Sequence, residues 1–124
     1  MSYLVDANVL SEATKPSPDT KVVEWLRDNE REIVIDPVLP GVQRRRRLQR
    51  WFELGVKRIH CLPWEPACGL RWAKLLADLR AAGHAMPITD SLIAATALVH
   101  GITVATRNVR DFRKAGVKIV NPFA

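Results

Sequence analysis

The sequence contains few of the residues that bind zinc or form disulfides. Its only cysteines, Cys61 and Cys68, have a spacing that fits neither a CxxC redox pair nor a zinc site. The three histidines, His60, His84 and His100, lie on unrelated segments and form no cluster. These absences exclude a disulfide framework and indicate that both cysteines are buried or idle thiols.

Long apolar runs are absent as well. No stretch approaches the roughly 18 apolar residues that a membrane span needs, and no basic segment precedes the first apolar residues, as it would in a secretion signal. Hydrophobic residues at 48% and charged residues at 26% are typical of a soluble globular protein. We therefore expect a cytoplasmic chain, without a membrane partner, that forms a single domain over residues 1–124.

Negative charge is the scarcer sign. The chain has 19 lysines and arginines against 13 aspartates and glutamates, so its net charge is +6 and its pI is about 9.9. Excess positive charge favours polyanions and speeds their encounter, which points to nucleic acid or to an acidic protein segment as a partner.

Short aliphatic runs alternate with helix-like segments along the whole chain. We expect strands over residues 3–5, 33–35, 57–62, 102–105 and 117–120. Helices are expected over residues 7–13, after Asp19 or Thr20, over 44–54, from 65 or 66 to 82, over 89–100 and shortly after 106. This alternation predicts an α/β fold, a three-layer α/β/α sandwich with a mostly parallel central sheet.

The expected helix over residues 89–100 is apolar on nearly all sides. We expect Thr89 to cap it and Gly101 to end it, as Gly83 ends the preceding helix. A helix of this kind is buried, so Asp90 in its first turn places a charge at the edge of the core.

Three acids occupy element boundaries. Asp6 directly follows the first strand, Asp90 opens the buried helix, and Asp111 follows the fourth strand with Asn108 three residues before it. Asp6 could simply cap the helix that follows. If the acids converge, however, their carboxylates repel one another unless a cation intervenes. The pattern therefore predicts a site for Mg²⁺ or Mn²⁺, which prefer oxygen ligands and can activate a bound water.

A run of four arginines, Arg44, Arg45, Arg46 and Arg47, opens the expected helix over residues 44–54. Positive charge at a helix N-terminus opposes the helix dipole, so the run does not serve helix stability. Two interpretations stay open: a solvated basic face, or a patch that contacts phosphates together with Lys15 and Arg107.

Three motifs together carry a family resemblance. Residues 4–8 (LVDAN), 87–97 (PITDSLIAATA) and 106–112 (TRNVRDF) resemble, in order and spacing, a PIN domain, specifically a VapC-type toxin of a bacterial toxin–antitoxin pair. The resemblance covers nearly the whole chain. It implies a PIN-like fold and an endoribonuclease that uses Mg²⁺ or Mn²⁺ to cut RNA such as tRNA. It also implies a homodimer that a cognate VapB-type antitoxin neutralises.

The resemblance also assigns roles to individual residues. By position, Asp6 and Asp90 correspond to the principal metal ligands. Asn108 and Asp111 correspond to the more variable last acidic site, where Asn108 stands in a place that is often an acid. The catalytic set is therefore Asp6, Asp90, Asp111 and Asn108, and the expected RNA phosphate contacts are Arg44, Arg45, Arg46, Arg47 and Arg107.

One departure from the family pattern stands out. VapC-like chains usually carry a glutamate on a helix after the second strand, whereas this sequence has no acid between Asp36 and Glu53. The proline- and glycine-containing stretch over residues 38–43 suggests that an internal segment is missing. Asp36 and Glu12 are the alternative acids, and local disorder is expected over residues 37–47.

Two functions remain open at this point. The first is an active metal-dependent endoribonuclease toxin. The second is a PIN-fold protein that binds antitoxin or RNA without cutting, because the usual glutamate-bearing helix is absent. An apolar groove lined partly by Leu10, Trp25 and Trp51 could receive an antitoxin helix, unless these residues simply belong to the core. An unrelated function on a basic α/β scaffold would require three coincident motifs.

Overall fold

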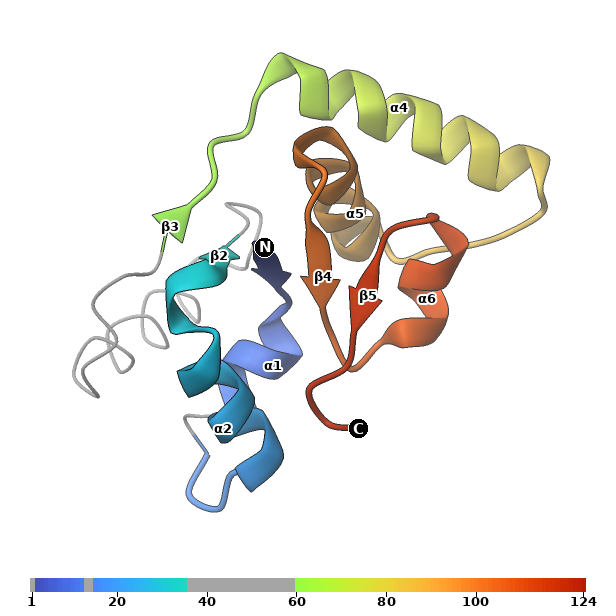
Figure 1. The fold of residues 1–124 in the computed structure, drawn as a ribbon. Helices are drawn as coiled ribbons and strands as arrows, with labels where there is room; N and C mark the ends of the chain where they lie inside the picture. Colours follow the sequence, from blue (N-terminus) through green and yellow to red (C-terminus); the bar gives the residue numbers. More distant parts are fainter. Residues whose placement is uncertain (1, 13–14, 36–59) are drawn as a thin grey trace.

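The fold is built around one parallel sheet with helices on both faces (Figure 1). The computed structural model describes residues 2–12, 15–35 and 60–124. The strands are β1 (Tyr3–Val5), β2 (Ile33–Ile35), β3 (His60–Cys61), β4 (Thr103–Ala105) and β5 (Ile119–Val120). The helices are α1 (Ala7–Glu12), α2 (Thr20–Asp28), the 3₁₀ helix η1 (Glu30–Glu32), α4 (Pro66–Ala81), α5 (Ile88–His100) and α6 (Val109–Lys114).

The strand order places β1 in the middle of the sheet. The order is β3-β2-β1-β4-β5, and each of the four strand pairs is parallel. Tyr3 is in register with Ile33 on one side and with Thr103 on the other. After β1 the chain adds β2 and then β3 on one side, and it later adds β4 and then β5 on the other side. The direction in which strands are added therefore reverses between β1 and β4. In open parallel sheets, ligands bind outside the carboxyl ends of the strands at such a reversal.

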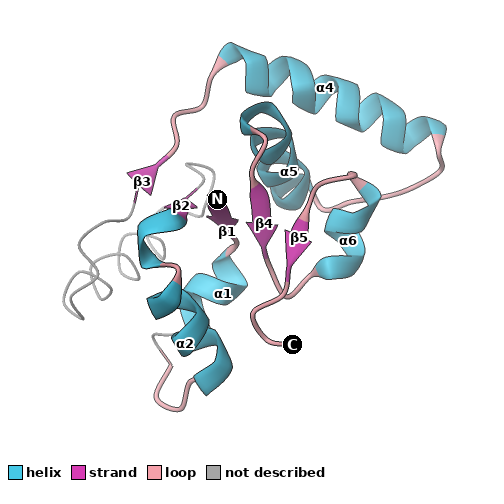
Figure 2. Ribbon diagram, viewed as in Figure 1, coloured by secondary structure: helices cyan, strands magenta, loops and turns pink. Residues whose placement is uncertain are grey.

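The helices divide between the two faces of the sheet. Right-handed crossovers put α1 and α2 on one face and α4, α5 and α6 on the other. Figure 2 shows α1 and α2 lying together, apart from α4 and α5. The expected three-layer α/β/α sandwich is confirmed, and its sheet is entirely parallel within the described ranges.

The core consists of aliphatic side chains from the strands and from one side of each helix. Strand residues Leu4, Val5 and Val104 are fully buried, as is Phe112 of α6. Leu10, which could have lined a groove, is 1% exposed and belongs to this core. Trp25 packs edge-to-face on Tyr3 with ring centroids 5.0 Å apart. The core interpretation therefore holds for Leu10, and Trp51 lies outside the described residues.

The end of α4 follows from its glycine, as expected. Gly83 has φ +69°, which residues other than glycine rarely adopt. This conformation lets His84 N–H donate to Leu79 O at 2.9 Å and Gly83 N–H donate to Arg80 O at 3.1 Å. Both bonds satisfy carbonyl groups that the last helical turn would otherwise leave open.

The start of α5 differs from the expectation. Thr89 does not cap the helix; α5 begins at Ile88, and Pro87 takes the cap position. The reason is that Pro87, in extended backbone geometry, already accepts the first helical hydrogen bond, from Ser91 N–H at 2.9 Å. The expected burial holds for the middle of the helix, whereas Ile88 is 69% exposed. Gly101 ends α5 in the left-handed conformation, as expected.

Several other expectations are tested by the described residues. Asp19, rather than Thr20, caps α2 by accepting Lys21 N–H at 2.9 Å. The 3₁₀ helix η1 was not expected, and β4 and β5 begin later than the aliphatic runs suggested. Cys68 is a buried free thiol. Outside the described residues lie the side chain of Cys61, Asp36, the arginine run and the segment over 37–47.

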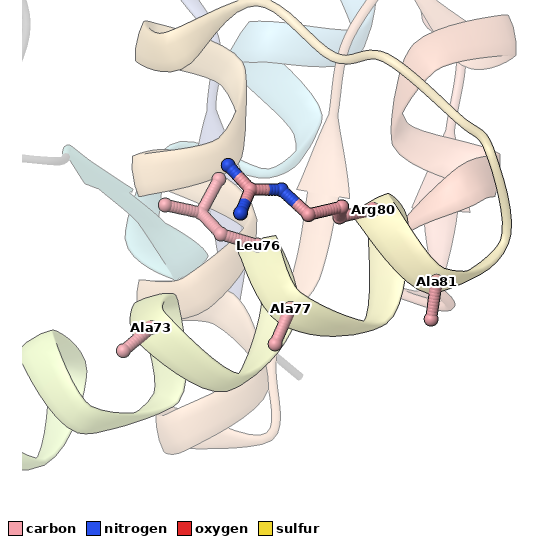
Figure 3. Close-up of a pocket in the computed structure, with 5 residues that line it drawn as sticks. All are labelled: Ala73, Leu76, Ala77, Arg80 and Ala81. Atoms are coloured by element: carbon pink, nitrogen blue, oxygen red, sulfur yellow. The ribbon is translucent and has the colours of Figure 1, made fainter.

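The outer side of α4 carries a shallow hollow of about 510 Å³. Figure 3 shows the residues that line it: Ala73, Leu76, Ala77, Arg80 and Ala81. No acid lines this hollow, so it is separate from the polar residues at the carboxyl end of the sheet. Within the described ranges, none of the helices combines the length and apolar character needed to cross a bilayer.

Candidate functional site

Asp6 lies at the carboxyl end of the central strand. Its backbone N–H donates to Ala105 O at 2.9 Å, which ties the end of β1 to the end of β4. Its Oδ1 accepts Ala7 N–H at 2.8 Å, so the carboxylate also caps α1. Its Oδ2 accepts the hydroxyl of Thr106 at 2.8 Å and Asn8 Nδ2, from α1, at 3.3 Å. With 6% exposure, Asp6 is held by α1 through both carboxylate oxygens and by Thr106 through Oδ2.

Thr106 connects the two strand ends through side-chain hydrogen bonds. It follows β4 as Asp6 follows β1, and it is fully buried. Its Oγ1 accepts Asn108 N–H at 2.9 Å and Asn8 Nδ2 at 3.3 Å while donating to Asp6. Thr106 belongs to the motif over residues 106–112, but no role was predicted for it. The only available signal was its place directly after a strand, the same place that Asp6 occupies.

Asn108 joins two of the expected acids. Its Nδ2 donates to Asp90 Oδ2 at 2.8 Å and to Asp111 Oδ2 at 2.9 Å. A primary amide has two N–H groups, so these bonds use both of them. The structure therefore brings Asp90, Asn108 and Asp111 together and connects them, through Asn108 and Thr106, to Asp6.

The electrostatics distinguish the three acids. The pKa of Asp90 is raised to about 6 by burial first, then by the negative charges of Asp6 and Asp111, against the lowering effect of the Asn108 hydrogen bond. Burial also raises the pKa of Asp6, although the bonds from Thr106 and Ala7 oppose that rise. Asp6 and Asp90 therefore form a mutually repelling pair that a cation would stabilise.

Asp111 is held differently. Its hydrogen bond from Asn108 and its contact with Lys114 lower its pKa. Lys114 Nζ lies 3.3 Å from Asp111 Oδ1 and also donates to Ala85 O at 2.9 Å. Asp111 thus already has a cationic partner within the chain, whereas no lysine or arginine of the described residues forms an ion pair with Asp6 or Asp90.

The donor set fits a hard divalent cation with two protein carboxylates. Among the residues that the structure describes, no group of three His, Cys, Asp or Glu side chains converges to hold a metal. Mg²⁺ nevertheless often uses only one or two carboxylates and completes its shell with water and substrate phosphate. Asp6 and Asp90 are the residues that could hold such an ion.

Glu12 does not supply the missing acid. It is buried, and its Oε2 lies 2.7 Å from Lys15 Nζ while its Oε1 accepts Asp19 N–H at 3.1 Å. The hydrogen bond from Lys15 is the main reason that its pKa is lowered. Glu12 and Lys15 therefore secure the connection between α1 and α2. The other alternative acid, Asp36, is outside the described residues.

Of the expected phosphate contacts, Arg107 and Lys15 fall in the described part of the chain, whereas Arg44 to Arg47 do not, and Lys15 is paired with Glu12. The side chain of Arg107 is exposed, and its backbone N–H donates to Asn8 Oδ1 at 3.2 Å. Its guanidinium lies over the ring of Phe123, 4.7 Å from the centroid. Arg107 therefore stands beside the acids without contacting them.

The comparison with protein families places the chain as a whole. The model of the PIN domain matches residues 3–118. The chain belongs to the PIN-domain family. This confirms the resemblance on which the metal and RNA assignments depend.

This PIN domain has relatives of similar extent. It is 33% identical to the plasmid stability protein StbB of Pseudomonas syringae pv. tomato, over 97% of both chains. It is 31% identical to toxin FitB of Neisseria gonorrhoeae, again over 97% of both, and 30% identical to VapC ribonuclease Y4jK of Sinorhizobium fredii, over 97% and 96%. The crystal structure of FitAcB from Neisseria gonorrhoeae superposes with a TM-score of 0.78 at 27% identity, covering 98% of both chains.

The lengths of these alignments bear on the missing segment. The alignment with StbB runs over 135 positions, and that with FitB over 137, although this PIN domain has 124 residues. The relatives therefore have residues without a counterpart here, which agrees with a shortened chain.

Proposed function

We propose that this PIN domain is a metal-dependent endoribonuclease toxin that a cognate VapB-type antitoxin neutralises in the cytoplasm. The observation that carries the proposal is the pair of Asp6 and Asp90 at the carboxyl end of the sheet. Both carboxylates are at least partly buried, both have raised pKa values, and the pKa of Asp90 is raised partly by Asp6. The printed names of the relatives, a toxin and a ribonuclease among them, support the same class.

In this proposal, different residues of the chain would bind the metal, orient its ligands and bind RNA. Asp6 and Asp90 would hold Mg²⁺ or Mn²⁺, which when bound lowers the pKa of a water and stabilises charge on a phosphate. Thr106 orients Asp6, and Asn108 orients Asp90 and Asp111 through its two N–H groups. Arg107 would bind an RNA phosphate beside them, because guanidinium matches the geometry of phosphate oxygens.

A second function has a specific observation in its favour. No third carboxylate joins Asp6 and Asp90 at metal-binding distance in the described part of the chain, and the aligned relatives have additional residues. Losing a metal ligand weakens binding and removes an oriented contact to water. The alternative is therefore a PIN-fold protein that binds antitoxin or RNA without cutting.

The decisive experiment is RNA cleavage at several Mn²⁺ concentrations, after removal of any bound antitoxin. Asp6→Asn and Asp90→Asn keep the side-chain size, and Asp78→Asn on the exposed side of α4 is the matched control. We expect wild type and Asp78→Asn to cut RNA and both site variants to lose activity by at least about 100-fold. A folded wild type that is as inert as Asp6→Asn would favour the binding function instead.

The partners are part of the same proposal. The relative FitB is by name a toxin, and the crystal structure that superposes at 27% identity is of FitAcB, which supports an antitoxin partner. We also propose a homodimer. Light scattering coupled to size exclusion should give twice the mass of 14.0 kDa for the free toxin, and the monomer mass would contradict this part.

A further inference from the structure

The cations near the carboxyl end of the sheet are held in two different ways. Lys15 pairs with Glu12 at 2.7 Å, and Lys114 pairs with Asp111 at 3.3 Å. Arg107 instead lies over the ring of Phe123 at 4.7 Å. In the described ranges, no carboxylate lies within ion-pair distance of its guanidinium. Arg107 is thus oriented by an aromatic ring; its charge helps to lower the pKa of Glu12, but the two form no ion pair within the described residues.

This difference matters for anion binding. A carboxylate partner occupies N–H groups and cancels charge, as Glu12 does for Lys15. An aromatic ring attracts the cation through its face, so the in-plane N–H groups of guanidinium stay available to accept a bidentate phosphate. Phe123 can therefore reduce the motion of Arg107 without competing with a phosphate.

Phe123 is itself well placed. The C-terminal turn is closed by Phe123 N–H donating to Asn121 Oδ1 at 3.0 Å and by Ala124 N–H donating to Asn121 O at 3.1 Å. Pro122 between them is buried. Figure 1 shows this segment beyond the end of β5, at the same end of the sheet as α1. The ring is thus anchored by the backbone around it.

Arg107 also lies next to the residues that bind the acids. It stands between Thr106, which donates to Asp6, and Asn108, which donates to Asp90. Its backbone is fixed through Asn8, so its distance from the acids is set by a three-residue turn. A phosphate bound to Arg107 would therefore lie beside the proposed metal site.

We propose that Phe123 is a positioning residue that holds Arg107 for binding an RNA phosphate, so that the C-terminal turn forms part of the RNA-binding surface. This inference rests on the proposed function only in taking RNA as the anionic ligand. It adds Phe123, a residue that has no part in the proposed catalytic or metal-binding set.

The test is binding of a fluorescent RNA hairpin, measured by anisotropy in EDTA so that no cleavage occurs. Arg107→Ala should weaken binding and lower the slope of log K against log salt by about 1. Phe123→Leu should weaken binding by roughly 2- to 5-fold, as expected for loss of one exposed cation–π contact. Phe123→Trp should restore or improve binding, because tryptophan is the best partner for a cation.

The double variant gives the sharper result. Once Arg107 is alanine, Phe123→Leu should cause no further loss, because the ring then has no cation to hold. Equal losses from Phe123→Leu in both backgrounds would overturn the inference and would indicate that the ring contacts RNA directly. Arg80→Ala on α4, across the molecule from the C-terminal turn (Figure 1), is the control for losing one exposed charge.

The outcomes separate this inference from the proposed function. A wild type that binds RNA but does not cut it, with Phe123→Leu weakened as above, contradicts the nuclease and supports the inference. A wild type that cuts RNA while Phe123→Leu binds like wild type contradicts the inference alone. A wild type that binds no RNA also overturns the inference about Phe123. Thermal unfolding of each variant checks that the fold is kept.

Discussion

Asn108 holds together two acids that come from different helices. Replacing it with aspartate would remove two hydrogen bonds and add a negative charge beside Asp90 and Asp111. Without metal, we expect Asn108→Asp to lower the free energy of unfolding by about 1–3 kcal/mol. Asn108→Asp should nevertheless bind Mn²⁺ more tightly than wild type, because a further carboxylate attracts the ion. Thermal unfolding in EDTA and in Mn²⁺ measures both effects.

A control variant with an exchange of the same size shows whether the effect belongs to the position of Asn108. Asp78→Asn, the reverse exchange on an exposed surface, should leave stability nearly unchanged in both buffers. If Asn108→Asp is as stable as wild type in EDTA and gains nothing from Mn²⁺, then Asn108 does not hold the acids at a cation site.

Asp90 predicts a pH dependence of stability in the absence of metal. Its pKa is raised from 3.8 to about 6 in the folded protein, so the folded state keeps a proton that the unfolded state loses. Its contribution is fully present below pH 3.8 and is lost as the pH rises through about 6. Asp111 and Glu12, with lowered pKa values, act in the opposite direction and at lower pH.

The variant Asp90→Asn isolates this contribution. Between pH 4 and pH 7 in EDTA, the unfolding temperature of wild type should fall relative to that of Asp90→Asn. Saturating Mn²⁺ should remove the fall, because the ion favours the charged carboxylate. Parallel profiles of the two proteins across this range would show that Asp90 does not titrate as described.

The role of a single residue could be predicted from the sequence only where its type and its place next to one strand or helix were enough to suggest that role. Asp6 and Asp90 stand out because an acid beside a buried strand or helix is costly. Thr106 does not stand out, because threonine after a strand commonly caps a turn. Its role depends on β4 pairing with β1, which brings together residues about a hundred positions apart in the chain.

At the scale of elements, two glycines of α4 and its C-terminal turn give a matched pair. A Cβ on Gly69 or on Gly83 would meet nothing within 4 Å, so neither substitution creates a clash. Gly69 lies within the helix, and Gly69→Ala should stabilise by roughly 0.5–1 kcal/mol. Gly83 has φ +69°, and Gly83→Ala should destabilise by roughly 1–2 kcal/mol. Urea unfolding of both variants checks the opposite signs.

The ends of helices could be predicted where one residue type decides the backbone. Gly83 and Gly101 were expected at helix ends, because glycine adopts positive φ easily, and both have positive φ there. The prediction of Thr89 as the cap was wrong, because the carbonyl of Pro87 accepts the first helical bond two residues earlier than a threonine cap would allow. The short 3₁₀ helix η1 has no distinctive residue pattern, and it follows from how the end of α2 connects to β2.

At the scale of the whole molecule, alternating strands and helices were enough to predict a parallel α/β sandwich. The strand order was not predicted, because it depends on which strands lie side by side and not on any one segment. That order places Asp6 and Thr106 at the ends of adjacent strands, and Asn108 connects them to Asp90. The site could therefore be suspected from the sequence, while its connections required the fold.

The net charge of +6 is unevenly distributed along the sequence, and its largest cluster is the run Arg44 to Arg47. We expect this run to contact RNA phosphates, so replacing all four arginines with glutamine should weaken RNA binding. The slope of log K against log salt should fall by up to about 3, near 0.7 for each lost contact to single-stranded RNA. A control that replaces the exposed Lys21, Arg27, Arg31 and Lys118 makes the same change in net charge. If both quadruple variants lower the slope equally, the effect is one of total charge, and the run is a solvated basic face.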